Sequence, residues 1–299
     1  MMRQILFIIV LIFPIRMLGN VSVSISGEMD NSAVKTIIES TVSALLTEIN
    51  DAQAAGRAIE LGAMDMTTWA QEYITTLLNN YSLFCPNDVI VENCVTTNTG
   101  YQVRNVPLEL IHIVDSDSNK VELQNAVISF DKNGQLNSFY LGLSDALYEK
   151  AIKKNIDTIE LRHRQIIIDF VEHLKTAYYT KEKEFLEQVF NTSKRGFSKE
   201  DSYAYMNRLN RVFERDTHIK AMIDEIKIIR HPSRMDFYEM TLYLGYSSNN
   251  YIDSGYLFVL WCFVDGKSPE LIECIWQPNL PNGDRIPEED LISLSDFDF

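Results

Sequence analysis

The sequence predicts an α+β protein built from two similar halves, each with helices first and a curved antiparallel sheet afterwards. At the start of each half, apolar residues recur at spacings of three and four, which is typical of a helix with one buried stripe. At the end of each half, short apolar segments alternate with turn residues, which is typical of antiparallel strands. The chain is also longer than one small core usually organises, which favours two domains.

Residues 1–19 are typical of a cleaved secretory signal. Met1–Arg3 give a positive start, Ile5–Ile15 form an apolar stretch, and Leu18-Gly19-Asn20 offers a small-residue exit. The stretch is shorter than the roughly 20 apolar residues that a spanning helix needs, and no later segment approaches that length. We therefore expect an exported chain that does not span a membrane once the signal is removed. An uncleaved N-terminal anchor is the alternative.

In the first half, the apolar spacing predicts a helix over 31–54 that Gly56 ends. A second helix is expected from Thr68 to Asn80, with Thr68 as its cap and Gln71 returning the bond. Asn133-Gly134 accepts the positive φ angles of a tight turn and predicts a hairpin. The strands expected around it are 89–95, 100–114, 126–130 and 136–143.

The second half repeats this order after a helical linker over 144–158. Asp157 and Glu160 form a capping box for a long helix whose single apolar stripe reaches Tyr178. Two further helices are expected over 182–190 and 199–215, the latter capped by Ser198. Strands are then expected over 219–230, 237–246, 256–264 and 271–277.

The segment 256–264, Tyr-Leu-Phe-Val-Leu-Trp-Cys-Phe-Val, is apolar on both faces. A strand with one face in water would alternate apolar and polar residues. We therefore expect its sheet to be covered twice: by its own helices on one side, and by the other half or a second copy of the chain on the other. This predicts either an extensive domain interface or a homodimer.

The four cysteines favour disulfides in an exported chain. Cys85 and Cys94 would close a short loop that contains Pro86-Asn87-Asp88. Cys262 and Cys274 lie almost symmetrically about a turn near Gly266, so they either form a bridge across a hairpin or remain buried thiols.

The composition also excludes several classes of function. A net charge of −15 disfavours nucleic-acid binding, which needs a basic surface. The five histidines are dispersed, and no metal or cofactor is expected. The segment that starts at Asp115 begins like a calcium loop, but Lys120 replaces the turn glycine and Ala126 replaces the bidentate Glu.

Several segments resemble nuclear transport factor 2-like domains, a cone-shaped α+β fold shared with ketosteroid isomerase. They are Arg162–Phe190, 203–213, Gly255–Trp261 and Trp276-Gln-Pro278 in the second half, and Thr97–Arg104 and 126–143 in the first. Together they look like a tandem envelope protein of Gram-negative bacteria. The resemblance implies two cone-shaped domains over 20–150 and 158–280, a tail over 281–299, and a location in the periplasm or at the cell surface.

The resemblance to ketosteroid isomerase suggests a search for a carboxylate base that faces a Tyr inside the cone. The loosely suitable group is Asp224, Glu225, Tyr238 and Tyr243, and the candidate binding residues are Asp224, Tyr238, Tyr243, Trp261 and Trp276. Thr158, in Asp157-Thr158-Ile159, matches a short acceptor pattern for O-glycosylation, although helix capping also explains this motif.

The absence of a convergent catalytic motif favours a non-catalytic exported protein that binds a protein or an envelope component. The alternative is a cone pocket for a small apolar or carbohydrate ligand, with isomerase or hydrolase chemistry. The C-terminal segment 291–299 alternates apolar and polar residues and is suited to pairing as an edge strand.

Overall fold

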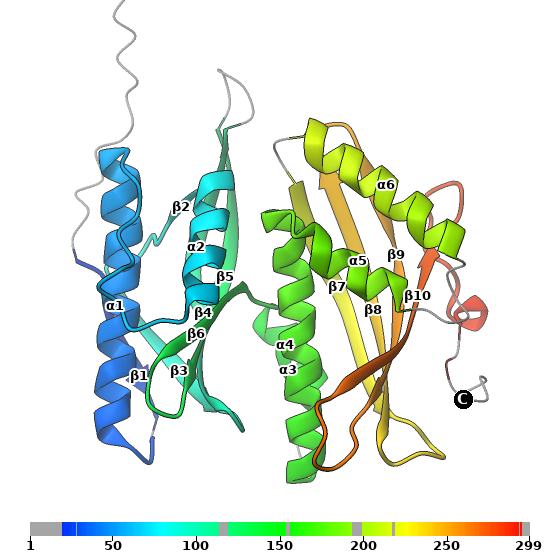
Figure 1. Ribbon diagram of the computed structural model, residues 1–299, viewed down its shortest axis with the longest axis horizontal. Helices are drawn as coiled ribbons and strands as arrows, with labels where there is room; N and C mark the ends of the chain where they lie inside the picture. Colours follow the sequence, from blue (N-terminus) through cyan, green and yellow to red (C-terminus); the bar gives the residue numbers. More distant parts are fainter. Residues whose placement is uncertain are drawn as a thin grey trace, which may run out of the picture.

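The computed structural model describes residues 20–27, 29–113, 119–153, 156–192, 199–216, 219–292 and 294. The predicted leader, the Asp115 loop, the Ser198 cap and the end of the chain lie outside these residues. The first half comprises β1 (Ser22–Ser26), α1 (Ser32–Ala55), α2 (Thr68–Asn80), β2 (Ser82–Phe84), β3 (Val89–Thr96), β4 (Gly100–Ile113), β5 (Asn119–Asp131) and β6 (Leu136–Leu141). The second half comprises α3 (Asp145–Ile152), α4 (Thr158–Thr180), α5 (Lys183–Asn191), α6 (Lys199–Arg215), β7 (Ile219–Arg230), β8 (Phe237–Ser248), β9 (Ile252–Cys262), β10 (Glu270–Pro278) and the short η1 (Glu288–Asp290) (Figure 1).

Local sequence signals account for the ends of the first helices. The Asn31 side chain accepts hydrogen bonds from the amides of Ala33 and Val34 and starts α1, and Gly56 ends it with a φ of 62°. The cap of α2 is Thr67, one residue earlier than predicted, because its hydroxyl accepts from the Ala70 amide. These caps fix where the helices lie on the first sheet.

The first sheet has the order β1-β3-β4-β5-β6, with β2 also paired to β4. The sequence analysis missed β1, which pairs parallel with β3, so this sheet is mixed rather than purely antiparallel. Val21, Val23 and Ile25 are buried beside α1 while the serines between them are exposed. This alternation of apolar and polar residues is the signal that could have found the strand.

The second sheet is antiparallel, in the order β10-β9-β8-β7, and α4, α5 and α6 lie on its inner face (Figure 1). Burial of both faces of β9 is confirmed, since Phe258 is 2% and Trp261 7% exposed. The outer face is covered by the chain's own C-terminal segment, which packs Leu291, Ile292 and Leu294 on it. The expectation that the other half covers this face was therefore wrong, and a homodimer stays a prediction.

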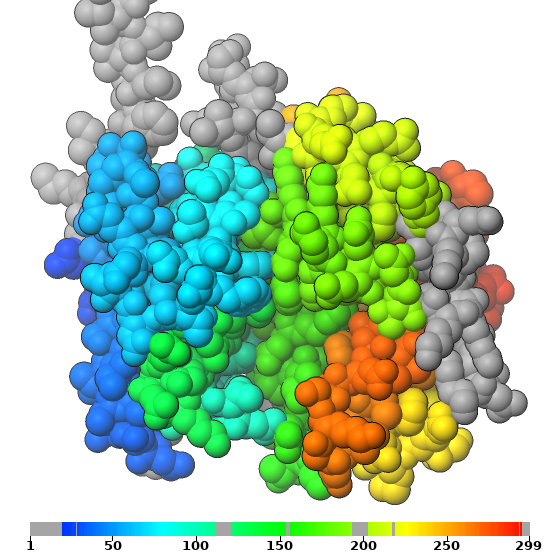
Figure 2. Space-filling model, viewed as in Figure 1, coloured from blue at the N-terminus to red at the C-terminus, as the bar shows by residue number. Residues whose placement is uncertain are grey.

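Helix α4 lies between the two sheets and contacts β6 and α2 of the first half as well as β7 of the second. In the space-filling view, α2 in cyan abuts α4 and α5 in green (Figure 2). The predicted apolar stripe of this helix is mostly buried, but it is not the only buried part, because the polar side chains of Arg164, Glu172 and Lys175 are buried too. One hydrophobic core continues through both halves.

A buried ion pair attaches the first sheet to α4. Arg104 of β4 forms a bidentate pair with Glu172 of α4, and both side chains are almost fully buried. The Arg104 guanidinium also lies 3.7 Å from the ring centroid of Tyr148. The Leu143 amide donates to Glu172 Oε1 at 3.0 Å. The halves are thus joined by charged and apolar contacts together.

The four cysteines are free thiols, so the expected Cys85–Cys94 bridge is not formed, and Cys262 and Cys274 follow the thiol alternative. The sheet register places Cys262 opposite Glu270 and Cys274 opposite Val259, which prevents the two sulfurs from facing each other. The Cys85 thiol is directed to the Asn87 carbonyl at 3.4 Å, and Cys94 is paired in the sheet with Val103.

None of the helices in the described part of the chain is both long and apolar enough to cross a bilayer.

Candidate binding hollow between the two halves

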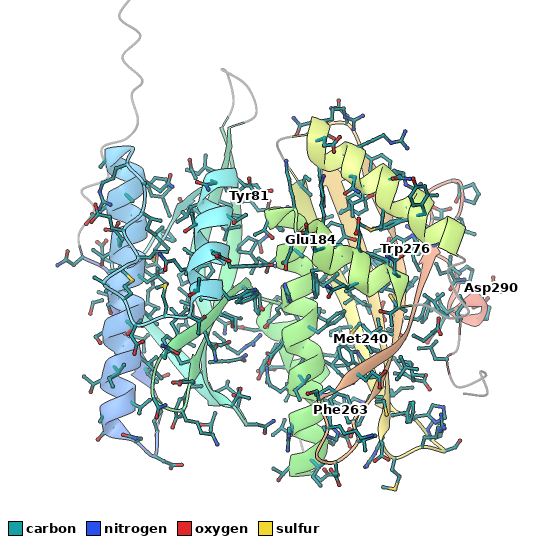
Figure 3. The ribbon with its side chains drawn as sticks, viewed as in Figure 1. Tyr81, Glu184, Met240, Phe263, Trp276 and Asp290 are labelled. Carbon is teal, nitrogen blue, oxygen red and sulfur yellow. The ribbon has the colours of Figure 1, made fainter. Side chains whose placement is uncertain are left out.

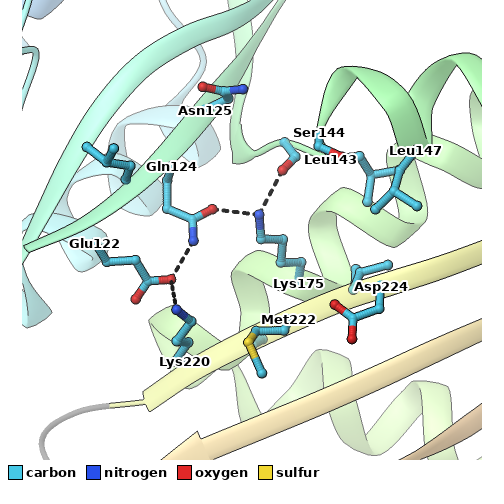
Figure 4. A pocket seen from close by; sticks show the side chains of 14 residues that line it. Glu122, Gln124, Asn125, Leu143, Ser144, Leu147, Lys175, Lys220, Met222 and Asp224 are labelled. Carbon is cyan, nitrogen blue, oxygen red and sulfur yellow. Dashed lines mark hydrogen bonds and ion pairs between the residues drawn. The ribbon is translucent and has the colours of Figure 1, made fainter.

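A hollow of about 420 Å³ lies between β5 and β7 (Figure 4). One side is formed by residues 122–125 of β5, and the facing side by residues 220–224 of β7. Residues 142–144 and Leu147, where α3 begins, close a third side. Lys175 projects into the hollow from α4. The site therefore takes residues from both halves and from the helix that joins them.

Lys175 is the central charged group of the hollow and is only 8% exposed. Its Nζ donates to Gln124 Oε1 and to the Gly142 carbonyl, each at 2.7 Å. Burial disfavours the charged form and lowers the pKa of Lys175 to about 8, while the carboxylates of Glu172 and Glu122 oppose this shift. The sequence analysis missed this residue because it read α4 as having one buried stripe.

Glu122 connects the two halves at one end of the hollow. Its Oε1 accepts a hydrogen bond from the Tyr179 hydroxyl at 2.8 Å and another from the Gln124 amide. The same oxygen lies 3.4 Å from Nζ of Lys220 on β7. Burial raises the pKa of Tyr179 well above its usual value, so Tyr179 remains a neutral donor. The ion pair crosses the hollow beside Lys175 (Figure 4).

Both long sides of the hollow are strand edges. β7 is the outermost strand of its sheet. β5 pairs with β6 only over 126–130, so among the described strands residues 119–125 have a neighbour on one side only. The Asn125 carbonyl at the end of this edge already accepts from the Gly142 amide at 2.7 Å. At the mouth of the hollow, Leu123 is 75% and Met222 43% exposed. Strand edges of this kind are templates for pairing with another chain.

A second feature lies on the inner face of the second sheet. Tyr238 and Trp261 are buried there, and neither the Tyr238 hydroxyl nor Trp261 Nε1 has a hydrogen-bond partner. The His163 ring of α4 contacts Tyr238 edge to face with centroids 5.2 Å apart, and its Nδ1 also lacks a partner. Buried polar atoms normally find partners, so this group is unusual.

The structure separates the residues considered for an isomerase-like site. Asp224 lies at the hollow and pairs with Arg285 at 3.1 Å. The Arg285 guanidinium also lies 3.7 Å from the ring centroid of Tyr243, which packs on the outer face of the sheet. Tyr238 belongs to the core on the inner face. Asp224 and Tyr243 therefore do not converge with Tyr238 in one cone.

The two other predicted positions have separate surroundings. Trp276 lies on the inner face of β10, with its ring centroid 6.3 Å from that of Tyr205 on α6 (Figure 3). Thr158 is the exposed first residue of α4. The Asp157 carboxylate caps this helix by accepting from the Glu160 amide at 2.8 Å. Glycosylation of Thr158 stays a prediction.

No protein-family model matches the chain, and no curated protein matches it either. Among solved structures it is similar to Bd1075 of Bdellovibrio bacteriovorus, at 18% identity and a TM-score of 0.32 over 42% of this chain. The chain spans less than half of that protein, 44%. It is also similar to a chain named Rd1NTF2_05 with five substitutions, at 10% identity and a TM-score of 0.26, over 38% of this chain and 99% of that one. A third similar structure is an Ntf2 like protein involved in plasmid conjugation, at 10% identity and a TM-score of 0.21, over 67% of this chain and 80% of that one.

Proposed function

We propose that the chain is a non-catalytic binding protein that takes an extended segment of a partner protein into the hollow between its halves. The observation that carries this proposal is that two strand edges, residues 119–125 of β5 and the edge of β7, border one hollow. An extended segment that pairs with such an edge gains backbone hydrogen bonds. Contacts with Leu123 and Met222 at the mouth would select apolar side chains.

The contacts that fix the strands around the hollow support the same function. The Arg104–Glu172 ion pair is buried between β4 and α4, and the Tyr81 hydroxyl donates to the Ile219 carbonyl at 2.9 Å. These contacts set the position of each strand edge before a partner arrives. Preorganisation of this kind lowers the entropy lost on binding.

The proposal includes export and action in the periplasm or at the surface of a Gram-negative bacterium. The charged and apolar pattern of residues 1–19 supports export. N-terminal sequencing of the protein isolated from its native cells tests this part. A start near residue 20 in the envelope fraction is the expected result, and retention of Met1 in a cytosolic fraction would contradict it.

Affinity selection from a synthetic library of random octapeptides tests the binding function. One pool has free C-terminal carboxylates and a second pool has C-terminal amides, and bound peptides are identified by mass spectrometry. The variants Leu123→Lys and Met222→Lys place charge at the mouth and should weaken the selected peptides about tenfold or more. Val89→Lys is the matched control, because Val89 is 68% exposed on β3, outside the hollow.

Hydrogen exchange supplies the structural readout of the same experiment. Bound peptide should slow amide exchange within 119–125 and 219–224, where the strand edges gain hydrogen bonds. The proposal fails if neither pool yields a binder. It fails equally if the mouth variants bind as well as the control, or if protection appears only elsewhere.

A small-ligand pocket in the second half is a second candidate function. The unpartnered hydroxyl of Tyr238 and Nε1 of Trp261 favour it, because each is a buried donor that a ligand oxygen could satisfy. Thermal-shift measurements with a panel of cyclic ketones and monosaccharides test it. A ligand that raises the melting temperature of the natural protein, but not that of Tyr238→Phe, would support this function, and no shift with any member would oppose it.

A further inference from the structure

Lys175 brings a buried positive charge into the hollow without a direct ion pair to a carboxylate, although Glu172 and Glu122 lie near enough to act on its charge. An ammonium has three donor hydrogens, and the two hydrogen bonds of Lys175 go to the neutral oxygens of Gln124 and Gly142. Within the described part of the chain, no carboxylate oxygen forms an ion pair with its Nζ within 4.0 Å. A buried charge without an opposite charge is costly unless a ligand supplies one.

The carboxylates around the hollow already have cationic partners. Glu122 pairs with Lys220 at 3.4 Å, and Asp224 pairs with Arg285 at 3.1 Å. Glu172, which lies deeper on α4, forms the bidentate pair with Arg104. Each of these three carboxylates is therefore paired with another cation, and none of them forms a direct ion pair with Lys175.

The start of α3 brings backbone N–H groups to the same hollow, and Asp145 in the first turn of this helix adds an opposing negative charge. Ser144 is the N-cap residue of α3 and lines the hollow, yet its side chain makes no capping hydrogen bond. The first amides of a helix favour an anion through their unpaired N–H groups and the helix dipole. Lys175 and the start of α3 thus border the same space.

We propose that Lys175, together with the start of α3, binds the free C-terminal carboxylate of the extended segment that enters the hollow. This inference rests on the proposed peptide-binding function. The Glu122–Lys220 ion pair lies beside Lys175 in the hollow (Figure 4). We choose a chain end as the occupant because its carboxylate can reach Lys175 while the preceding residues pair with one strand edge, and the comparison of acid with amide tests this choice.

The inference also predicts how affinity depends on pH. The titratable groups that face Lys175 are Glu122 on β5, Glu172 and Tyr179 on α4, and Lys220 and Asp224 on β7. Because burial lowers the pKa of Lys175 to about 8, the free protein loses this positive charge as the pH rises through that value. Affinity for a carboxylate should therefore be high at pH 7 and decline by pH 9.5.

The test compares each selected octapeptide as a free acid and as a C-terminal amide, with Kd measured by calorimetry on the natural full-length protein. The amide should bind about tenfold more weakly or worse at pH 7, as expected for loss of a charged hydrogen bond. The difference should shrink at pH 9.5. In Lys175→Met the acid should lose the same affinity while the amide is unchanged. Lys227→Met, at an exposed position of β7 outside the lining of the hollow, should keep the preference for the acid.

The outcomes separate this inference from the function on which it rests. Equal binding of acid and amide by the natural protein would overturn the carboxylate subsite and leave peptide binding intact. Absence of binding by both forms would overturn the function itself. The acid and amide comparison needs no variant, so it decides the question even if Lys175→Met does not fold.

Discussion

Tyr238 and Trp261 lie directly opposite each other on β8 and β9, and both carry a buried polar hydrogen that has no partner. The pair lies on the inner face of the second sheet, where His163 and Phe263 pack against Tyr238. Each unpaired group costs stability because it has lost water and gained nothing in return. Two buried donors without partners therefore lie side by side on the inner face of the second sheet.

The first prediction concerns the Tyr238 hydroxyl. Tyr238→Phe removes an unpartnered group and should leave the free energy of unfolding unchanged or raise it by about 1 kcal/mol. Tyr178→Phe is the control, because the Tyr178 and Tyr205 hydroxyls share a buried hydrogen bond of 2.8 Å. This second change should lower the free energy by about 1 kcal/mol. Urea unfolding compares the two, and a large loss in Tyr238→Phe would show that the hydroxyl has a partner in solution.

The second prediction concerns the buried ion pair between the halves. Arg104→Met leaves the Glu172 carboxylate buried without its cation and should lower the free energy of unfolding by about 3 to 5 kcal/mol. Arg57→Met is the comparison, because Arg57 pairs with Glu48 at the surface, where solvent screening makes such pairs contribute little to stability. Similar losses in both variants, measured by denaturant unfolding, would show that the Arg104 pair does not hold the halves together.

The third prediction concerns Asp169 on α4. Burial raises its pKa to about 6, although Gln102 and Gln165 donate to its Oδ1 at 2.8 and 2.9 Å. The folded state therefore binds this proton more tightly than the unfolded state, so stability falls as the pH rises through about 4 to 6. Asp169→Asn keeps the acceptor and removes the charge.

This substitution should make the protein more stable than its parent at pH 7.5, with the gain disappearing near pH 4. Thermal unfolding at both values measures it. A gain that is the same at both values would mean that the effect of the substitution is not electrostatic.

The elements of the fold could be predicted from the sequence where one face of a helix or strand is buried. The stripe that includes Ile38, Leu45 and Ile49 identified α1 because the opposite face meets water. Helix α4 broke this rule because it is covered from both sides. Its buried Glu172 is satisfied by Arg104, which lies far away in the sequence, and no periodicity shows such a pairing.

The hollow was predictable only in part for the same reason. Asp224 was named from the sequence and does line the hollow, but Lys175 and Glu122 were not. Lysine at a helical spacing normally indicates a solvent-exposed face. Its burial here depends on the Gly142 carbonyl and the Gln124 side chain, which reach it only after both halves have packed on α4.

The fourth prediction concerns the cysteines. Since Cys262 lies opposite Glu270 and Cys274 opposite Val259, a bridge between them would require β9 and β10 to shift register. Peptide mapping of the protein without reduction should therefore find Cys274 as a thiol. Burial also raises the pKa of this thiol, so it should react with alkylating reagents only after unfolding. Rapid labelling of Cys274 in the native protein would contradict the buried register.

The last prediction concerns the segment that covers the outer face of the second sheet. Gln277 holds this segment through both ends of its amide, donating to the Asp290 carbonyl and accepting from the Ile292 amide, each at 3.1 Å. Leu294 is thereby buried to 2% exposure in the cluster that contains Phe258 and Leu260. Leu294→Ala should lower the free energy of unfolding by about 2 to 4 kcal/mol, because it leaves a cavity over an apolar face.

Leu280→Ala is the matched control, because Leu280 precedes the same segment but is 41% exposed. Its effect should stay within about 0.5 kcal/mol. The Leu294 variant should also bind a hydrophobic dye more strongly and self-associate, since loosening of the segment uncovers Tyr256 and Phe258. If both variants unfold at the same denaturant concentration as the parent, the C-terminal segment does not seal this face in solution, and the second cover of β9 must come from another molecule.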